Sequence, residues 1–311
     1  MAGIGGTTWF ALESRAETAR AKNAEALAQR NADQSKQDKL AAEKSAERSR
    51  EAFKIFIDAF LSVDPSAGAS ADMLAKDVLL RAKDRLENSE LDDEGKAEFL
   101  GALTISLLGI GQYDSAVSTA EAALAINKTI LGPDHPETLR SMSNLAKGYS
   151  QVGKTTQAFK LNQQVLELRK SILGHDHPST LTSMNNLAGD FLLMGRTGEA
   201  LKLFQQVLEL RKDISGPDHP DTLSSMNNLA SSYRQAGKTS ESLKLSQQVL
   251  ELRKIKLGPD HPGTLTSMND LVVSYYHAGR NDEALNLSQQ VLELRKTKLG
   301  HDHPSLSLIH I

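Results

Sequence analysis

The sequence of 311 residues contains no cysteine, which excludes disulfide bonds, thiolate metal sites and a cysteine nucleophile. This absence leaves both redox compartments open. Aromatic residues make up only 5% of the chain, and no apolar run reaches the roughly 20 residues that cross a bilayer as a helix. Ala, Leu, Gln, Lys and Glu are abundant instead, and this composition predicts an all-α protein.

The chain also lacks a dominant charge. Its 36 Lys and Arg residues are interspersed with 39 Asp and Glu residues, and the net charge is −3 at pH 7. Without a broad basic field, we expect no nucleic acid partner. No grouping of serine, histidine and acid stands out from the repeat pattern, so we expect neither an enzyme nor a bound cofactor.

One octapeptide, Gln-Gln-Val-Leu-Glu-Leu-Arg-Lys, occurs four times at a constant spacing of 42 residues, starting at Gln163, Gln205, Gln247 and Gln289. A longer unit surrounds it, with Asp-His-Pro, Thr-Leu-x-Ser-Met and Gly-Lys or Gly-Arg at fixed offsets. A period of this length is typical of arrays of small units that bury their apolar faces only against their neighbours.

Each unit is predicted to be a helix hairpin. Pro136 suits the first turn of a helix, and Asp134 is placed to cap that turn. Gly153 ends the first helix where a positive φ is needed, and Gly174 ends the second. Residues 94–134 lack the His-Pro dipeptide and read as a degenerate first unit, which gives about five helix pairs.

We expect the octapeptide and the repeated histidines to have structural roles. We expect Val165 and Leu168 to point into the core, and Glu167, Arg169 and Lys170 to form ion-pair ladders between repeats on the outer surface. A zinc site needs three or four converging ligands, so packing and capping is the favoured role for the histidines, with a weak metal site as the alternative. The histidines stand next to Pro at positions 135, 177, 219, 261 and 303.

The N-terminal third has a different pattern. Residues 13–51 contain neither Gly nor Pro and predict one long helix, whose only sizeable aliphatic residues are Leu27 and Leu40. A solvated stalk is favoured over a coiled coil, which needs an apolar residue every 3.5 positions. Oligomerisation through this helix stays open, and sedimentation of residues 13–93 would test it. An apolar stripe at the end of the helix is expected to dock on the array: Phe53, Phe56, Ile57, Phe60 and Leu61.

The predicted organisation therefore has four parts. Residues 1–62 form an apolar N-terminus and the long helix, and residues 63–93 form a linker and an amphipathic helix. The array covers residues 94–305. The last six residues, 306–311, depart from the repeat and resemble the translated end of a sequencing transposon, so that the natural protein would continue beyond them; a genuine apolar tail is the alternative.

The repeats resemble tetratricopeptide repeats of the 42-residue kind found in kinesin light chains. The resemblance is carried by Leu-Gly-Pro-Asp-His-Pro at 131–136 and 257–262 and by the spacing of the packing positions. It implies a right-handed solenoid of antiparallel helix hairpins, whose concave face holds an extended peptide or a partner domain. Catalysis is not implied. The packing positions are Leu139, Met142, Leu145, Ala146, Tyr149 and Ala158.

The N-terminal third combines a segment ending in Gly-Thr-Thr-Trp at 6–9, a charged Ala-rich helix and a Phe/Ile/Leu helix ending in Asp-Pro at 64–65. Together with the repeats, it is more loosely similar to the region after the kinase domain in bacterial receptor-type serine/threonine kinases. This second resemblance implies a sensor or regulatory region at a bacterial membrane, on either face, if a span precedes Met1; an apolar N-terminus without that role is the alternative. Kinase motifs such as His-Arg-Asp and Asp-Phe-Gly are absent from the sequence, so phosphoryl transfer is not assigned to it.

Residues 148–155 fit the Gly-x4-Gly-Lys-Thr pattern of a phosphate-binding loop letter by letter. Such a loop follows a strand and opens a helix, so that its N–H groups face the phosphates. Here the first glycine falls inside a predicted helix, and the equivalent stretches of the other units lack it. We therefore expect no nucleotide partner.

A candidate groove follows from the helical wheel. At 100° per residue, positions 140, 143, 144, 147 and 151 of the first hairpin fall beside the packed face, on the side that lines the concave surface in this family. Amides repeated there can pair with both N–H and C=O groups of an extended peptide. Alternatively they bridge neighbouring helices and bind nothing. The candidate groove residues are Arg140, Ser143, Asn144, Lys147, Thr182, Asn185, Asn186, Ser224, Asn227, Asn228, Thr266, Asn269 and Asp270.

Overall fold

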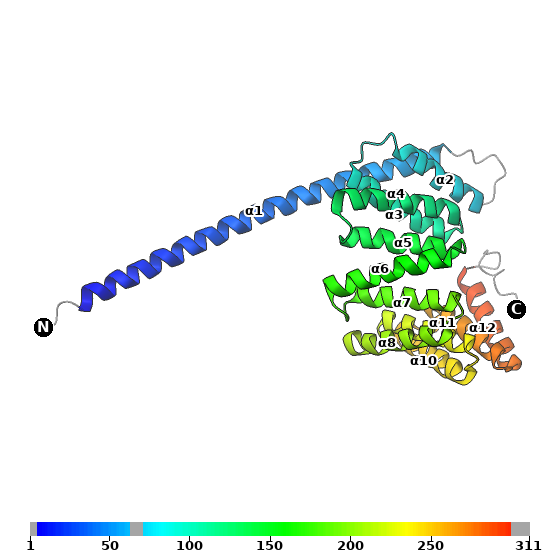
Figure 1. Ribbon diagram of the computed structural model, residues 1–311. Coiled ribbons are helices and arrows are strands. Elements are labelled where there is room, and N and C mark those ends of the chain that lie inside the picture. The colour runs from blue at the N-terminus through cyan, green and yellow to red at the C-terminus, as the bar shows by residue number, and fades with distance from the viewer. Residues whose placement is uncertain (1–4, 63–70, 300–311) are drawn as a thin grey trace. The chain divides into compact units, whose positions relative to one another are not determined.

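A computed structural model describes residues 5–62 and 71–299, and these residues form twelve α-helices and no strand. The all-α prediction is confirmed (Figure 1). The chain divides into two compact units, residues 1–106 and 107–311. No helix in the described ranges combines the length and the apolar character that crossing a bilayer requires. The linker predicted at residues 63–70 and the tail at 306–311 lie outside the described residues.

The first unit is dominated by α1 (Gly5–Leu61), a single helix of 57 residues, as the absence of Gly and Pro predicts. Its side chains between residues 22 and 47 are all exposed, which agrees with a solvated stalk. The amphipathic helix α2 (Ala71–Leu86) packs on α1 and buries Ala82 and Leu86.

The apolar stripe at the end of α1 was assigned wrongly. Phe53, Phe60 and Leu61 are 67%, 65% and 74% exposed, and Ile57 is exposed as well. The residues that α1 buries here include Ile55 and Ala59, which lie roughly 200° and 240° around the helix from Phe53. The end of α1 is apolar on more than one side, and the side with the small Ala59 permits the closer approach. Of the predicted five, Phe56 makes a ring contact, with its centroid 5.2 Å from that of Phe99.

A polar cluster also ties α1 to α3 (Asp93–Gly109). Arg48 Nη2 lies 2.7 Å from Asp92 Oδ2 and 2.5 Å from Glu94 Oε2. Hydrogen bonding to Arg48 holds the pKa of Asp92 well below its usual range. Asp92 Oδ1 also accepts from the Gly95 N–H at 2.9 Å, so the same carboxylate caps the start of α3.

The second unit is the repeat array, in which each second helix packs on the first helix of the next hairpin. The residues of the predicted degenerate pair form α3, most of which belongs to the first unit, and α4, and the four regular units of the second unit form hairpins (Figure 1). The helices of the array run α4 Tyr113–Leu131, α5 Pro136–Gln151, α6 Thr155–Leu173, α7 Pro178–Leu193, α8 Thr197–Ser215, α9 Pro220–Gln235, α10 Thr239–Leu257, α11 Pro262–His277 and α12 Asn281–Leu299.

The turn between hairpins is held by hydrogen bonds that its own side chains make. Gly132 has φ +87°, which an L side chain rarely adopts. The buried Thr138 donates its hydroxyl to the Gly132 carbonyl at 2.7 Å. His135 Nδ1 accepts from the Glu137 N–H at 3.3 Å, so histidine caps the helix, as it does in the next three units. The histidine capping role is confirmed, whereas the cap assigned to Asp134 is wrong because Pro at N1 makes the residue directly before it the N-cap.

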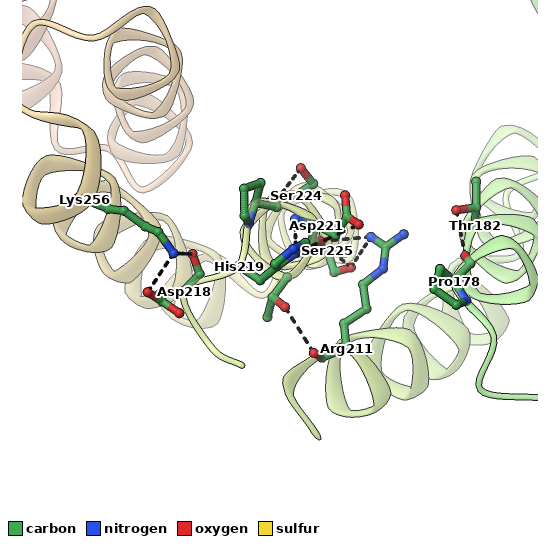
Figure 2. A network of polar contacts seen from close by, with 11 residues as sticks. Pro178, Thr182, Arg211, Asp218, His219, Asp221, Ser224, Ser225 and Lys256 are labelled. Atoms are coloured by element: carbon green, nitrogen blue, oxygen red, sulfur yellow. Dashed lines mark hydrogen bonds and ion pairs between the residues drawn. The ribbon is translucent and has the colours of Figure 1, made fainter. Parts of the chain in front are cut away.

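The predicted ion-pair ladder between repeats is also wrong. Glu167 pairs with Lys170 inside its own helix, at 3.3 Å. Arg169 is half-buried and points across the junction, where Nη1 donates to the Ser179 carbonyl at 3.1 Å and to Ser183 Oγ at 2.8 Å. Burial lowers the pKa of Arg169. Figure 2 shows the equivalent contact of Arg211. Arg211 therefore connects α8 to α9 through hydrogen bonds to uncharged oxygens.

The core follows the predicted helical period. Val165 is fully buried, as is Ala158, and Leu139 is 2% exposed. Leu168 is only half-buried and packs at the margin of the core, because Leu166 takes the position against the next hairpin. Leu229, near the middle of the array, is 4% exposed and packs in a cluster drawn from two hairpins.

We predict that Leu229→Ala lowers the free energy of unfolding by roughly 2–5 kcal/mol, because truncating a buried leucine loses its burial and leaves a cavity. Chemical denaturation followed by circular dichroism measures the change. Leu193→Ala on α7 is the matched control, because Leu193 is 61% exposed and should cost far less. Equal losses in the two variants would contradict the packing described above.

Candidate functional site

The predicted groove residues lie on α5, α7, α9 and α11, the first helices of the four regular hairpins. Each of these helices buries the opposite side through its Thr-Leu-x-Ser-Met segment, which leaves the groove positions accessible. Lys147 is exposed, as are Thr182, Ser224 and Thr266, and the other nine residues are half-buried.

A cavity of about 430 Å³ opens along three of these helices. It brings together four of the thirteen predicted residues, Lys147, Asn185, Asn186 and Asn228, whereas the other nine do not line it. Gly189 and Ser231, at the variable positions of the same face, also border it. The lining that the groove prediction missed consists of Ser150, Asn162, Asp190, Leu192, Leu193, Phe204 and Gln235.

One pair of groove amides bridges neighbouring first helices, as the alternative to ligand binding predicted. Asn228 Nδ2 on α9 donates to Asn185 Oδ1 on α7 at 2.9 Å, which leaves the second N–H of Asn228 and the amino group of Asn185 for other partners. Asn227 Oδ1 is buried and accepts no hydrogen bond from the described part of the chain. The remaining N–H groups of Asn185 and Asn228, both at the cavity, can therefore still bind a ligand, whereas Asn227 Oδ1 is buried and lies outside the cavity lining.

The groove hydroxyls, by contrast, are satisfied within their own helices. Thr182 and Ser224 donate to the carbonyls of Pro178 and Pro220, at 3.0 and 2.9 Å (Figure 2). Ser143 donates to the Leu139 carbonyl at 3.0 Å in the same way. Such local bonds are common for Ser and Thr in helices and leave the oxygen lone pairs as acceptors.

Asp190 lines the cavity and is only 3% exposed, and because of this burial it is called the floor of the cavity. Its Oδ2 accepts from Asn162 Nδ2 on α6 at 2.7 Å, and its Oδ1 accepts from Ser150 Oγ on α5 at 3.2 Å. Burial raises the pKa of Asp190, and the two hydrogen bonds oppose that effect. Within the described residues no basic side chain forms an ion pair with it. Asp190 is thus a buried carboxylate supported by neutral donors only.

The sequence did contain a signal for Asp190. The equivalent positions of the other units hold Gly148, Ser232 and Ser274, so an acid stands there once. Residues 28 apart meet where a second helix packs on the following first helix, as the Ser246 and Ser274 hydroxyls do at 3.0 Å. Asn162 stands 28 residues before Asp190, and the pair could have been found by comparing units at this spacing.

Sequence profiles of the tetratricopeptide repeat family match residues 97–171, 148–213, 191–255 and 264–305. The chain belongs to the tetratricopeptide repeat family. No curated protein sequence matches it. Its structure is similar to a kinesin light chain with nearly identical repeats from Podosopora anserina, at 29% identity and a TM-score of 0.56, over 67% of this chain and 99% of the other.

Two further solved structures share the fold at lower identity. BtubC from P. vanneervenii is 19% identical, with a TM-score of 0.54, over 76% of this chain and 95% of its own. A Rap protein complexed with competence and sporulation factor is 15% identical, with a TM-score of 0.50, over 77% of this chain and 72% of its own. The predicted tetratricopeptide repeat solenoid is thereby confirmed.

The phosphate-loop lookalike is part of a tetratricopeptide hairpin. Gly148 lies inside α5, as predicted, and a Cβ added there would approach Val117 Cγ2 on α4 to 2.9 Å. Gly153 and Lys154 donate their N–H groups to the carbonyls of Ser150 and Tyr149, so these groups do not converge on a ligand. Close helix packing and a turn explain the glycines.

The repeated histidines do not form a metal centre in the described part of the chain, where no three His, Asp or Glu side chains are grouped. His177 Nδ1 accepts from the Ser179 N–H at 3.1 Å, which occupies that nitrogen in capping. The sequence His-Asp-His occurs at 175–177 and at 301–303, and the second of these lies outside the described residues.

We predict opposite effects for alanine at two glycines of equivalent helices. Gly148→Ala should destabilise the array by about 1 kcal/mol net, since overpacking against the stiff Val117 exceeds the gain in helix propensity. Gly189→Ala, whose added Cβ meets nothing within 4 Å, should stabilise it by roughly 0.5–1 kcal/mol. Thermal melts of both variants measure the difference, and the same sign for both would contradict the packing.

We further predict that Asp190→Asn raises the free energy of unfolding at pH 7 by about 1 kcal/mol. The melting temperature at pH 7 should rise with it. Asn can accept from Asn162 and donate to Ser150 Oγ, while no charge is buried. The folded pKa of Asp190 lies above the ordinary value near 4, so wild-type stability falls as pH rises from about 4 through that folded pKa. The advantage of the variant should therefore shrink toward pH 4. An unchanged or lower melting temperature at pH 7 would show that the carboxylate is compensated.

Proposed function

We infer that the repeat array is a scaffold that binds an extended peptide or an unfolded segment of a partner protein across α5, α7, α9 and α11. The observation that carries this function is the cavity over α5, α7 and α9, where Asn185, Asn186 and Asn228 share one surface with apolar side chains. Ligand sites of this kind combine an apolar lining with a few convergent polar groups.

The chemistry of the amides suits a peptide backbone. Each primary amide supplies two N–H donors and one carbonyl acceptor, which matches the alternating N–H and C=O groups of an extended chain whatever its side chains. The Asn185–Asn228 bond holds two of these side chains in place and reduces the entropy lost on binding. The amides repeat with the 42-residue unit, so successive hairpins contact successive parts of the ligand.

The structural relatives support this function. The Rap protein was solved in complex with competence and sporulation factor, so the same fold binds a partner there. The kinesin light chain relative also consists of tetratricopeptide-like repeats and covers 67% of this chain.

Two other roles stay hypotheses. Self-association through α1 is favoured by one observation, the exposed Phe53, Ile57, Phe60 and Leu61. The regulatory role in a membrane kinase rests on the resemblance of the N-terminal third alone. Neither role conflicts with peptide binding by the array.

We predict that replacing Asn185, Asn227 and Asn269 together by Ala weakens peptide binding at least fivefold, because each lost hydrogen bond contributes about 0.5–1.5 kcal/mol. Fluorescence anisotropy with degenerate dodecapeptide pools measures the affinity. The melting point and helical circular dichroism should stay nearly intact.

The matched control replaces three exposed amides on second helices, Gln164, Gln206 and Gln248, by Ala. These residues carry the same chemistry at the same 42-residue spacing on another surface. Equal weakening in both triple variants, or no weakening in the groove variant, would overturn the groove assignment.

A further inference from the structure

The cavity described above has two chemically distinct walls. Phe204, Leu192 and Leu193 contribute apolar surface, and Asp190 with its donors Asn162 and Ser150 contributes an acidic floor. Phe204 and Asp190 are buried themselves, whereas Leu193 is 61% exposed at the border of the cavity. A group that fills this space can contact apolar side chains and the carboxylate of Asp190 together.

The carboxylate is short of partners for its charge. A carboxylate offers about four lone-pair sites, and the two hydrogen bonds to Asp190 come from neutral groups. Lys147 is the one basic residue among those that line the cavity, and it is exposed and farther than 4 Å from the carboxylate. A buried charge without an ionic partner costs stability, so its presence points to a ligand that supplies the partner.

We propose that the cavity over Asp190 receives a lysine or arginine side chain of the bound peptide, and that Asp190 is the residue that selects it. This inference rests on the function proposed above. The aliphatic stem of such a side chain packs on Phe204 and Leu192, and its charged end reaches the floor, as long basic side chains do at amphipathic sites. Contact of the cation with the Phe204 ring adds a favourable term.

The same site sets the register of the ligand. At the equivalent junctions the pairs are Ala120 with Gly148, Phe204 with Ser232 and Ser246 with Ser274, none of which carries charge. Amides recur at the groove positions of each hairpin, with Ser143 and Asp270 as the departures, and the amides alone would accept a peptide in several positions. Asp270 is a second, half-buried acid of the groove, but it does not line the cavity, so Asp190 gives one basic residue of the ligand a defined place there.

The test uses pools of acetylated and amidated dodecapeptides with one fixed central residue, all other positions being drawn from uncharged amino acids. The fixed residue is Lys, Arg, citrulline, Gln, norleucine or Glu. Citrulline has the shape of Arg without its charge and isolates the electrostatic contribution. Affinities are measured by fluorescence anisotropy for the full chain, for Asp190→Asn and for the control Asp213→Asn, which removes an exposed carboxylate outside the cavity.

We expect the wild-type chain and Asp213→Asn to prefer the Arg or Lys pool over citrulline, Gln and norleucine by about tenfold, as for a charge-assisted hydrogen bond. In Asp190→Asn this preference should fall below about twofold, while the citrulline and Gln pools bind as before. A wild-type chain that binds the pools without preferring a basic residue overturns the inference and leaves the proposed function standing. A preference that survives Asp190→Asn also overturns it, and a failure of every pool to bind overturns both.

Discussion

The structure depends on one packing relation, the contact of each second helix with the first helix of the next hairpin. A single hairpin has two apolar faces and buries only one of them by itself. Val165, Val207, Val249 and Val291 occupy the same position of successive second helices and are all fully buried. Because every junction repeats this arrangement, residues that are 28 apart in the sequence contact each other across the junction. This spacing holds in the core and in the groove.

The turns and polar bonds follow from the need to keep this relation in register. A positive-φ glycine, a histidine N-cap and a buried threonine bond fix the direction in which each new hairpin starts. Arg211 then crosses the junction and donates to the Asp221 carbonyl and to Ser225 Oγ. These bonds use the uncharged oxygens of the next helix, so adding hairpins does not require matching surface charges. The pair Lys256 and Asp218 adds one exposed ion pair between repeats.

Much of the fold could be predicted because the residues that start, end and pack each helix recur in four units. Pro136, Gly153 and Leu139 were placed correctly from local rules on helix starts, helix ends and the 3.6-residue period. The failures share a different cause. Arg169 and the end of α1 were assigned from one helix considered in isolation, whereas their partners lie on other elements and are set by packing. A helical wheel shows which residues share a face, but the neighbouring element decides which face is buried.

The candidate site also has a part that could be predicted from the sequence and a part that could not. The groove amides were predicted from their repetition, and four of the thirteen proposed residues line one cavity. Asp190 was not predicted as a site residue, because repetition was taken as the signal of function and Asp190 departs from the repeat. In an array, identical positions hold the fold and contact what is common to every ligand segment, such as a peptide backbone. A buried charge that occurs at one junction only, supported by Asn162 and Ser150, distinguishes that junction from the others and can therefore carry selectivity.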